Sequence, residues 1–490
     1  PYNRASGPSI RAVSGTKGAE MSQAAINALE QSAESPDFGG QFAELQATFR
    51  SGRSRDLAWR DAQLAALERM MAEQEAAIIE ALKQDLGKPA LESWTAEISY
   101  VAGDAAYCRK KLKKWAKPRK VYTPSVAQPG KSWVQAEPLG TVLIIGAWNY
   151  PLQLVLAGYA AAIAAGNCAI LKPSELAPAT SKLMAKIVPE YMDTDCVRVV
   201  EGAIPETTAL LELPFDHILY TGNGSVARIV MAAAAKNLTP VTLELGGKSP
   251  CIVLPDANLE TAARRIVWGK FTNAGQTCIA PDYILTDADT EAKLLPLIEN
   301  AIRDMYSDNP ETSDSYGCIV NERHFDRLMG LMESGKITVG GQNNRDTRFI
   351  SPTVLTGVST DSAVMQEEIF GPILPIVRID DLDEAIDFIR DGDKPLAGYL
   401  FTGDGASESR FIDEVSCGST CINDTMMFMM VHELPFGGVG GSGIGAYSGE
   451  YGFNTFSHMK AVMKRGWWPD PSLRYAPYTQ KKFDWMRRLR

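Results

Sequence analysis

The chain has 490 residues, of which 45% are hydrophobic and 22% are charged, and its formal net charge is −10 at pH 7. This length and composition are typical of a globular protein with two or three domains and argue against general disorder. The negative charge leaves no broad cationic surface for a phosphate backbone, so small molecules are favoured as partners over nucleic acid.

Eight cysteines are scattered along the chain, which is too few for the disulfide framework of a protein this long. Cys417 and Cys421 have metal-like spacing, but no second pair or histidine cluster accompanies them, so packing is favoured and no metal is expected. The cysteine pattern favours a reducing, cytoplasmic compartment.

The N-terminal residues, 1–40, are rich in Ser, Gly and Ala, and we expect them to form a flexible extension. From 42 to about 86, apolar residues recur at helical intervals among Arg, Glu and Gln, which predicts amphipathic helices. A basic segment at 109–115 then leads into a Pro/Gln/Gly-rich arm that ends near Gly130, which indicates a change of module.

Short apolar runs separated by helical patterns follow this arm, and they predict a parallel, doubly wound α/β sheet. These runs lie at 141–145, 169–171, 197–200 and 217–220. The stretch 152–171 carries no charge and has the length of a membrane span. However, Gly166 and Asn167 form a helix stop signal, so a buried helix followed by a buried strand is favoured.

A possible nucleophile and base come next. Cys278 lies in Phe-Thr-Asn-Ala-Gly-Gln-Thr-Cys-Ile-Ala-Pro, where small and hydroxyl-bearing neighbours allow a substrate to approach closely. Glu244 lies beside Gly246 and Gly247, which allow its carboxylate to move toward or away from that substrate. The alternative for each residue alone is structural, namely a packed cysteine and a strand-end glutamate.

Asn149 follows the first apolar run in Gly-Ala-Trp-Asn-Tyr-Pro and is a candidate oxyanion donor. A thiolate that adds to a carbonyl carbon creates an oxyanion, which a neutral amide and the Cys278 backbone N–H would stabilise together. A simple turn is the alternative.

Two further segments suit a dinucleotide. Lys172 and Glu175 follow the second run, so they place an ammonium and a ribose-binding carboxylate at the carboxyl edge of the sheet. The turn from Gly222 to Ser225 joins a strand to a helix, and its free N–H groups suit a pyrophosphate. A G-x-G-x-x-G match at 438–443 follows no strand and precedes no helix, so we reject it as the dinucleotide fingerprint.

Taken together, these motifs occur in the order found in the aldehyde dehydrogenase superfamily, and the chain resembles that superfamily from about 42 to 478. The resemblance rests on Asn149, Lys172 with Glu175, Glu244, Cys278, 367–372 and 434–438. Longer phrases at 238–251, 268–271 and 456–458 resemble the class 3 branch, which includes fatty and aromatic aldehyde dehydrogenases.

The resemblance implies a Rossmann-like cofactor domain, an α/β catalytic domain and a small bridging and oligomerisation module that contributes to a homodimer. The implied boundaries are 41–117 with 140–243, then 244–440, and finally 118–139 with 441–490. The tail at 481–490 is basic and too short to span a bilayer, so it is expected to be exposed or, at most, to touch a membrane surface.

The cofactor implied by the resemblance is NAD, with NADP possible. Lys172 and Glu175 would hold the adenine ribose, Glu368 would hold the nicotinamide ribose, and Phe436 would contact the nicotinamide. Ala227 stands where the family has its second phosphate-turn glycine, which leaves the local phosphate geometry open.

The expected reaction is oxidation of an aldehyde to a carboxylic acid through a thiohemiacetal and a thioester on Cys278, with Glu244 activating water. Transfer of the acyl group to coenzyme A and a catalytically silent binding protein are the alternatives. By resemblance, an apolar pocket would favour medium- to long-chain aliphatic or aromatic aldehydes. Its walls would be Tyr107, Tyr150, Trp268, Thr277 and Met426. For the Met/Phe run at 423–430, which contains Met426, packing in the hydrophobic core is an equally good interpretation.

Overall fold

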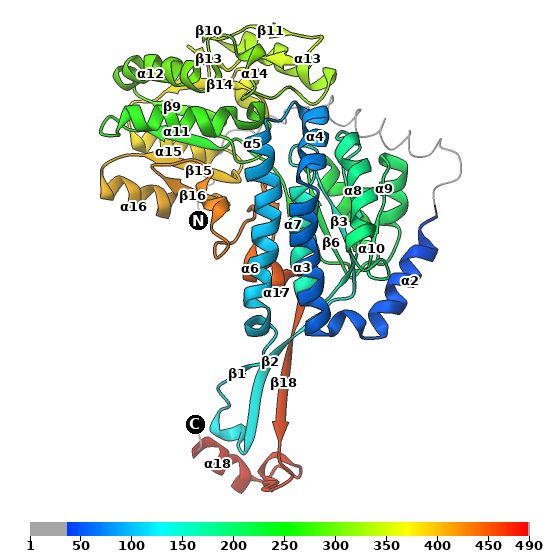
Figure 1. Ribbon diagram of the computed structural model, residues 1–490. Coiled ribbons are helices and arrows are strands. Elements are labelled where there is room, and N and C mark those ends of the chain that lie inside the picture. The colour runs from blue at the N-terminus through cyan, green and yellow to red at the C-terminus, as the bar shows by residue number, and fades with distance from the viewer. Residues whose placement is uncertain (1–36, 489–490) are drawn as a thin grey trace, which may run out of the picture.

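The computed structural model describes residues 37–488, so most of the expected N-terminal extension, 1–40, lies outside the described residues. A helix, α2 (Gly39–Arg50), begins within the last two positions of that segment. The described chain forms two lobes, and a long arm projects from one of them (Figure 1). The predicted α/β fold class is confirmed by the parallel sheets and their covering helices.

The first lobe contains a six-stranded sheet with the order β17-β7-β6-β3-β4-β5. All of its strands are parallel except β17, which runs antiparallel to β7. The strands are β3 (Thr141–Ile145), β4 (Cys168–Lys172), β5 (Val197–Val199), β6 (His217–Thr221), β7 (Val241–Glu244) and β17 (Gly443–Ile444). The four predicted apolar runs form β3 to β6 because central parallel strands are buried on both faces.

Helices cover both faces of this sheet. They include α3 (Leu57–Glu73), α4 (Glu75–Leu86), α6 (Ser99–Trp115), α7 (Gln153–Ala165), α8 (Pro178–Tyr191), α9 (Ile204–Leu211) and α10 (Gly224–Lys236). Every residue of α7 is buried, and the helix ends at Gly166, whose φ of 95° is left-handed. The uncharged stretch 152–171 is therefore a buried helix followed by β4, as predicted. Within residues 37–488, no helix is both long and apolar enough to cross a membrane.

The second lobe contains a seven-stranded sheet with the order β10-β13-β14-β9-β8-β15-β16, in which β10 alone is antiparallel to its neighbour. Its strands are β8 (Pro250–Val253), β9 (Tyr283–Thr286), β10 (Lys336–Val339), β13 (Thr353–Thr356), β14 (Ile373–Arg378), β15 (Ala397–Phe401) and β16 (Ser419–Ile422). A separate short ladder pairs β11 (Asn343–Asn344) with β12 (Phe349–Ile350).

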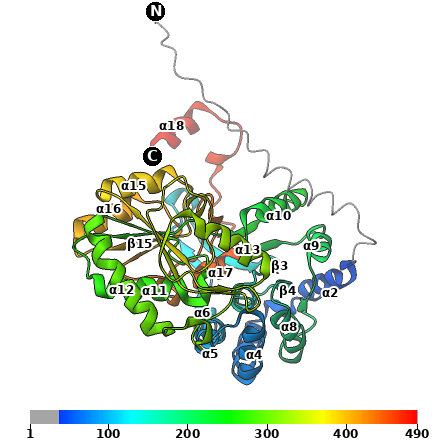
Figure 2. The same cartoon turned by 90° about the horizontal axis from the view of Figure 1, so that it is seen from above.

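The helices of the second lobe start at clear capping residues. The longer ones are α11 (Leu259–Phe271), α12 (Ala288–Tyr306), α13 (Glu322–Leu331), α15 (Leu382–Asp391) and α16 (Gly405–Glu414), and α14 (Ala363–Gln366) is a single turn. Each longer helix follows an Asn or Asp whose side chain accepts a backbone N–H bond from the first turn. Seen from above, α11, α12, α15 and α16 surround one lobe and α2, α4 and α8 lie beside the other (Figure 2).

The arm is a three-stranded antiparallel sheet with the order β1-β2-β18. It comprises β1 (Arg119–Val121), β2 (Gly130–Pro138) and β18 (Ser457–Arg465), and α18 (Gln480–Arg488) lies at its tip (Figure 1). Just before β18, α17 (Gly449–Thr455) packs on α7 so closely that a Cβ added to Gly452 would lie 2.9 Å from the Ala161 Cβ. The C-terminal part of the chain thus returns to the first lobe before it enters the arm.

Candidate active site

Cys278 lies on a tightly constrained loop after α11. A 3₁₀ turn, η4 (Thr272–Gly275), follows the helix, and Asn273 and Ala274 have φ values of 55° and 51°. Such left-handed conformations in non-glycine residues are costly and concentrate at functional sites. Gln276 anchors the loop, since its amide donates to the Cys318 carbonyl at 3.0 Å and its Oε1 accepts from the Val320 N–H at 2.9 Å. The thiol of Cys278 is therefore half-buried on a rigid segment.

Glu244 ends β7, and its carboxyl group is almost wholly buried, with 2% of the residue exposed. Neither of its oxygens has a hydrogen-bond partner among the described residues. Burial alone raises the pKa of this carboxyl well above its ordinary value. A buried polar group without a partner is expensive, so its presence at a strand end indicates a functional role.

The thiol and this carboxyl group influence one another. Burial raises the pKa of the Cys278 thiol, and the charges of Glu368 and Glu244 raise it further. The thiol is thus protonated at neutral pH in this state, so its proton must move to a base before the sulfur can act as a nucleophile.

Asn149 is fixed between the two lobes' loops. It follows β3 and is 2% exposed. Its Nδ2 donates to the Gln276 carbonyl at 3.0 Å, two residues before Cys278. Its own carbonyl accepts bonds of 2.9 Å from the Lys88 ammonium and the Asn273 side-chain amide. The structure therefore brings the predicted oxyanion donor to the loop that carries the predicted nucleophile.

Glu368 lies beside the glycines that follow Glu244. A Cβ added to Gly246 would lie 2.0 Å from the Glu368 Oε2, so only glycine permits this approach. Burial and then the Asp282 charge raise the pKa of Glu368 to about 8, while the Gly247 N–H and the Lys248 charge oppose that rise. Lys248 fixes the backbone next to Glu368. Its Nζ donates to the Asp282 carboxylate at 2.5 Å and to the Glu367 carbonyl at 2.9 Å.

The predicted dinucleotide residues lie at the carboxyl edge of the first sheet. Lys172 ends β4, is 2% exposed and donates to the Pro173 carbonyl at 2.8 Å. Its Nζ lies 3.8 Å from the Glu175 carboxylate, which is 44% exposed and free to bind a ribose. Gly222 and Ser225 lie before and within the first turn of α10, whose N-terminal N–H groups suit a phosphate. This arrangement at a parallel-sheet edge fits a dinucleotide.

The G-x-G-x-x-G match at 438–443 leads into the two-residue strand β17 and not into a helix, so its rejection as a dinucleotide fingerprint is confirmed. The predicted nicotinamide contact, Phe436, is buried and packs edge-on against Tyr447 with ring centroids 5.9 Å apart. Sequence reasoning missed Tyr447. Its buried hydroxyl has no partner among the described residues, and its pKa is raised by burial and then by nearby charges that include Glu244 and Cys278. The sequence signal that could have identified Tyr447 is its position as an aromatic residue just after the glycine-rich stretch 437–445.

Tyr150 and Thr277, two of the predicted pocket residues, lie together beside Cys278. The Tyr150 hydroxyl lies 2.8 Å from the Thr277 Oγ1, beside Cys278. Met426 is 7% exposed. Two residues later, the Phe428 ring stacks on Tyr399 with centroids 6.5 Å apart, and the Tyr399 hydroxyl donates to the Ile279 carbonyl next to Cys278.

The Tyr107 ring stacks on His432 at 5.1 Å, and its hydroxyl donates to Glu433 at 3.0 Å. Trp268 is 40% exposed on α11.

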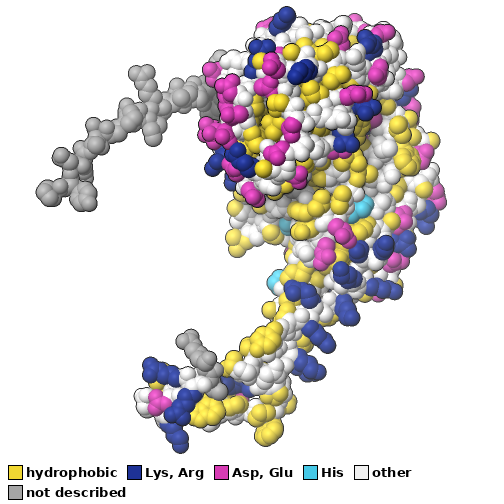
Figure 3. All heavy atoms as spheres, turned by 90° about the vertical axis from the view of Figure 1, so that its left-hand side faces the viewer, with side chains coloured by type: hydrophobic (Ala, Val, Ile, Leu, Met, Phe, Trp, Pro, Cys, Tyr) yellow, Lys and Arg dark blue, Asp and Glu magenta, His cyan; other side chains and the backbone are white. Residues whose placement is uncertain are grey.

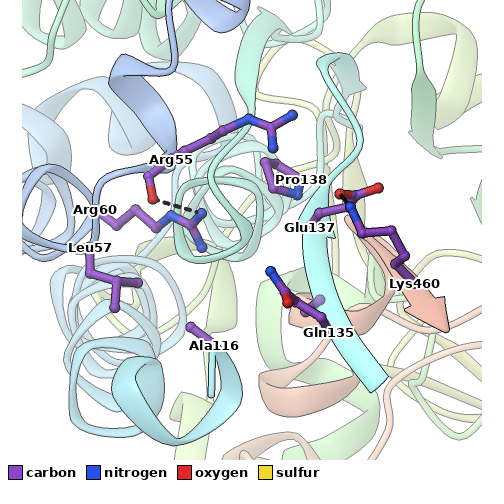
Figure 4. Close-up of a pocket in the computed structure, with 9 residues that line it drawn as sticks. Arg55, Leu57, Arg60, Ala116, Gln135, Glu137, Pro138 and Lys460 are labelled. Carbon is purple, nitrogen blue, oxygen red and sulfur yellow. Dashed lines mark hydrogen bonds and ion pairs between the residues drawn. The ribbon is translucent and has the colours of Figure 1, made fainter. Parts of the chain in front are cut away.

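A cavity of about 320 Å³ opens at the base of the arm and contains none of the predicted site residues (Figure 4). Arg60 lies in it, and its guanidinium donates to the carbonyls of Ser54, Arg55 and Ala164 at 3.1–3.2 Å. These bonds close the C-terminal turn of α7 and fix the chain before α3, so they explain the buried charge structurally. The lining is Arg55, Leu57, Arg60, Ala116, Gln135, Ala136, Glu137, Pro138 and Lys460. Among residues 37–488, no cluster of His, Cys, Asp and Glu has the form of a metal site.

Comparison with known proteins agrees with this geometry. The model of the aldehyde dehydrogenase family matches residues 22–462. The chain belongs to this family. It is 49% identical to rat aldehyde dehydrogenase family 3 member A2 over 449 residues, which are 91% of this chain and 93% of the relative.

A canine relative, described as aldehyde dehydrogenase, dimeric NADP-preferring, is 47% identical over 438 residues, 89% of this chain and 97% of the relative. The substrate-bound structure of Staphylococcus aureus AldH superposes with a TM-score of 0.90 at 44% identity, covering 92% of this chain and 99% of that one. The resemblance to the class 3 branch is therefore confirmed. This aldehyde dehydrogenase is an oxidoreductase that converts aldehydes to carboxylic acids with NAD or NADP.

Proposed function

We propose that Cys278, Asn149 and Glu244 form the catalytic centre of this aldehyde dehydrogenase. The observation that carries the proposal is the convergence of three separate segments. The Asn149 amide is bonded to the Cys278 loop, and the unpartnered Glu244 carboxyl affects the thiol from the end of β7. A nucleophile, an oxyanion donor and a base are the parts that covalent aldehyde oxidation requires.

In this proposal the Cys278 thiol first gives its proton to water. The resulting thiolate sulfur forms a bond to the aldehyde carbon, and the carbonyl oxygen becomes an oxyanion held by the Asn149 amide and the Cys278 N–H. When bound, the nicotinamide cofactor accepts the hydride that leaves this carbon. The acyl group then remains on Cys278 as a thioester. Glu244 takes a proton from water, the oxygen attacks the thioester carbon, and the acid leaves as the thiolate is restored.

The cofactor would be held by Lys172 and Glu175 at its adenine ribose, Gly222 and Ser225 at its phosphates, and Glu368 with Phe436 at its nicotinamide end. The close fit of Glu368 against Gly246 and the position of Gly222 and Ser225 at the N-terminal end of α10 support this assignment. NAD is the preferred form, since the exposed Glu175 carboxylate repels a 2′-phosphate. A Glu244 carboxyl beside the thioester also favours hydrolysis over transfer to coenzyme A.

The substrates are medium- to long-chain aliphatic or aromatic aldehydes. Support comes from Tyr150, whose hydroxyl lies 2.8 Å from the Thr277 Oγ1 beside the thiol, and from the burial of Met426. Each buried methylene contributes up to about 0.8 kcal/mol, so the apolar wall rewards longer chains.

The test is kcat/KM for aldehydes of increasing chain length, with benzaldehyde and succinic semialdehyde alongside, each with NAD. We expect kcat/KM to rise with chain length and to be low for the charged semialdehyde. A maximum at acetaldehyde or at succinic semialdehyde would contradict the proposed pocket.

We also propose the three predicted modules and a homodimer formed through the arm. Large hydrophobic side chains are exposed on the arm and at its tip, and Figure 3 shows them beside a row of Lys and Arg. They are Val121, Tyr122, Val126, Met459, Met463, Trp467 and Trp468. Exposed apolar area of this kind favours association. Sedimentation of the purified protein tests the dimer.

We also propose a reducing, cytoplasmic location. All eight cysteines are free thiols, which supports this location, and cell fractionation tests it.

A further inference from the structure

A buried ion pair lies behind the Asn149 loop and is not used by the proposed chemistry. Lys88 is 1% exposed and Glu97 is fully buried, and the Lys88 Nζ is paired with the Glu97 Oε1. Glu97 lies in η2 (Trp94–Ile98), a π-helical turn between α5 (Ala90–Ser93) and α6. Interruptions of this type are frequent at functional sites. Desolvating two charges is costly, so such a pair is weak evidence for stability and calls for another explanation.

Both side chains bind the segment that begins at Asn149. The Lys88 Nζ donates to the Asn149 carbonyl at 2.9 Å and lies 4.1 Å from the centre of the Tyr150 ring. The Glu97 Oε2 accepts the backbone N–H groups of Leu152 at 2.9 Å and Gln153 at 3.2 Å. The ion pair thus bonds the backbone of segment 149–153 at both of its ends.

Helix capping accounts for Glu97 alone. A carboxylate at the start of α7 satisfies two N–H groups and needs no lysine. Lys88 adds a direct bond to the carbonyl of the residue whose amide is the proposed oxyanion donor. Together with the Asn273 amide, Lys88 gives the Asn149 carbonyl two donors, which fixes the peptide from which that amide projects.

We propose that Lys88 and Glu97 are positioning residues for Asn149, an inference that rests on the oxyanion role proposed above. Lys88 holds the Asn149 peptide, and Glu97 holds Lys88 in place while it ties the same loop to α7. Neither residue touches the reacting atoms in this proposal. An amide displaced by a fraction of an ångström stabilises the developing oxyanion poorly, so acylation slows while cofactor binding persists.

The variants are Lys88→Met, Glu97→Gln and the double variant, each with and without Asn149→Ala. Acylation is followed as the NADH burst with a long-chain aldehyde, cofactor binding by NADH fluorescence, and stability by the Tm. Each single change leaves one buried charge unpaired, so the Tm of each single variant falls. The double variant removes both charges and recovers most of the Tm, which keeps the test informative if a single variant folds poorly.

We expect Lys88→Met and the double variant to lower the burst rate by about tenfold or more in the presence of Asn149, with NADH affinity within about twofold of wild type. In the Asn149→Ala background, the same changes have little further effect because the group that they position is gone. Recovery of the burst rate together with the Tm in the double variant, or an equal loss in both backgrounds, overturns the positioning role.

Asn149→Ala alone separates the two ideas. A wild-type burst in that variant overturns the oxyanion role, and the inference falls with it. A slow burst with an undiminished Lys88 effect overturns only the inference.

The matched control is Asp85→Asn. The buried Asp85 carboxylate accepts the N–H groups of Ala179 and Thr180 at 2.9 and 2.8 Å at the start of α8, as Glu97 does at α7. We expect this variant to lose Tm and keep its burst rate. If Asp85→Asn lowered the burst rate as much as Lys88→Met does, general destabilisation would explain the effects of Lys88 and Glu97, and the proposal would be overturned.

Discussion

Replacement of Glu368 by Gln should stabilise the protein, and the gain should grow with pH. Burial, followed by the Asp282 charge, raises the pKa of Glu368 from 4.5 to about 8. A carboxyl whose folded pKa is raised binds its proton more tightly when folded. Its contribution to the free energy of unfolding is therefore most favourable below pH 4.5 and declines as the pH rises to about 8.

The size of this effect follows from the shift. One pKa unit corresponds to about 1.4 kcal/mol, so the whole shift amounts to about 5 kcal/mol. Glu368 is half-buried, and residual water contact reduces this amount. Between pH 5 and pH 8 we expect the advantage of Glu368→Gln over wild type to increase by about 2–4 kcal/mol.

The assay is urea denaturation of both proteins at pH 5, 6.5 and 8, with NAD affinity measured in parallel. Glu367→Gln is the control, because Glu367 is the exposed neighbour and pairs with Arg327 at 2.9 Å. A stability difference that is the same at pH 5 and pH 8 would refute the reasoning. NAD affinity should fall in Glu368→Gln, since the variant loses the proposed ribose ligand.

Three further results are expected. Cys278→Ala should abolish NADH formation and leave NAD binding near wild type, whereas Cys421→Ala should retain activity; residual turnover in the first variant would argue against a covalent route. Glu244→Gln should keep a burst of NADH and slow steady turnover, and wild-type turnover should rise with pH because burial raises the pKa of this base. Glu175→Gln should narrow the preference for NAD over NADP in kcat/KM, and an NADP preference in wild type would contradict the assigned role.

The sequence predicted the elements whose signal is local. Apolar runs are visible in a linear chain, and β3 to β6 formed where those runs lie. Gly166 predicted the end of α7 for the same reason, since a left-handed residue is required there. Motif order also predicted that Asn149 and Cys278 belong to one site, and the bond from Asn149 to the Gln276 carbonyl joins their loops.

Features that depend on distant partners were not predictable in this way. Lys88 and Glu97 resemble ordinary charged helix residues until α7 is placed against them. The contacts of Tyr107 with His432 and Glu433 join segments far apart in the chain, and no local pattern links these segments. The raised pKa of Glu368 likewise depends on burial that only the assembled lobes create.

The burial of α7 has a consequence for biosynthesis. This helix has no polar face, and one of its neighbours, α17, lies almost 300 residues later in the chain. During synthesis on the ribosome, one apolar side of α7 therefore stays uncovered until residues 449–455, which form α17, have been synthesised. During that interval the nascent chain is a natural client for chaperones, and the first lobe cannot mature as an independent N-terminal unit. The close contact of Gly452 with Ala161 makes completion of the lobe one of the last steps of synthesis.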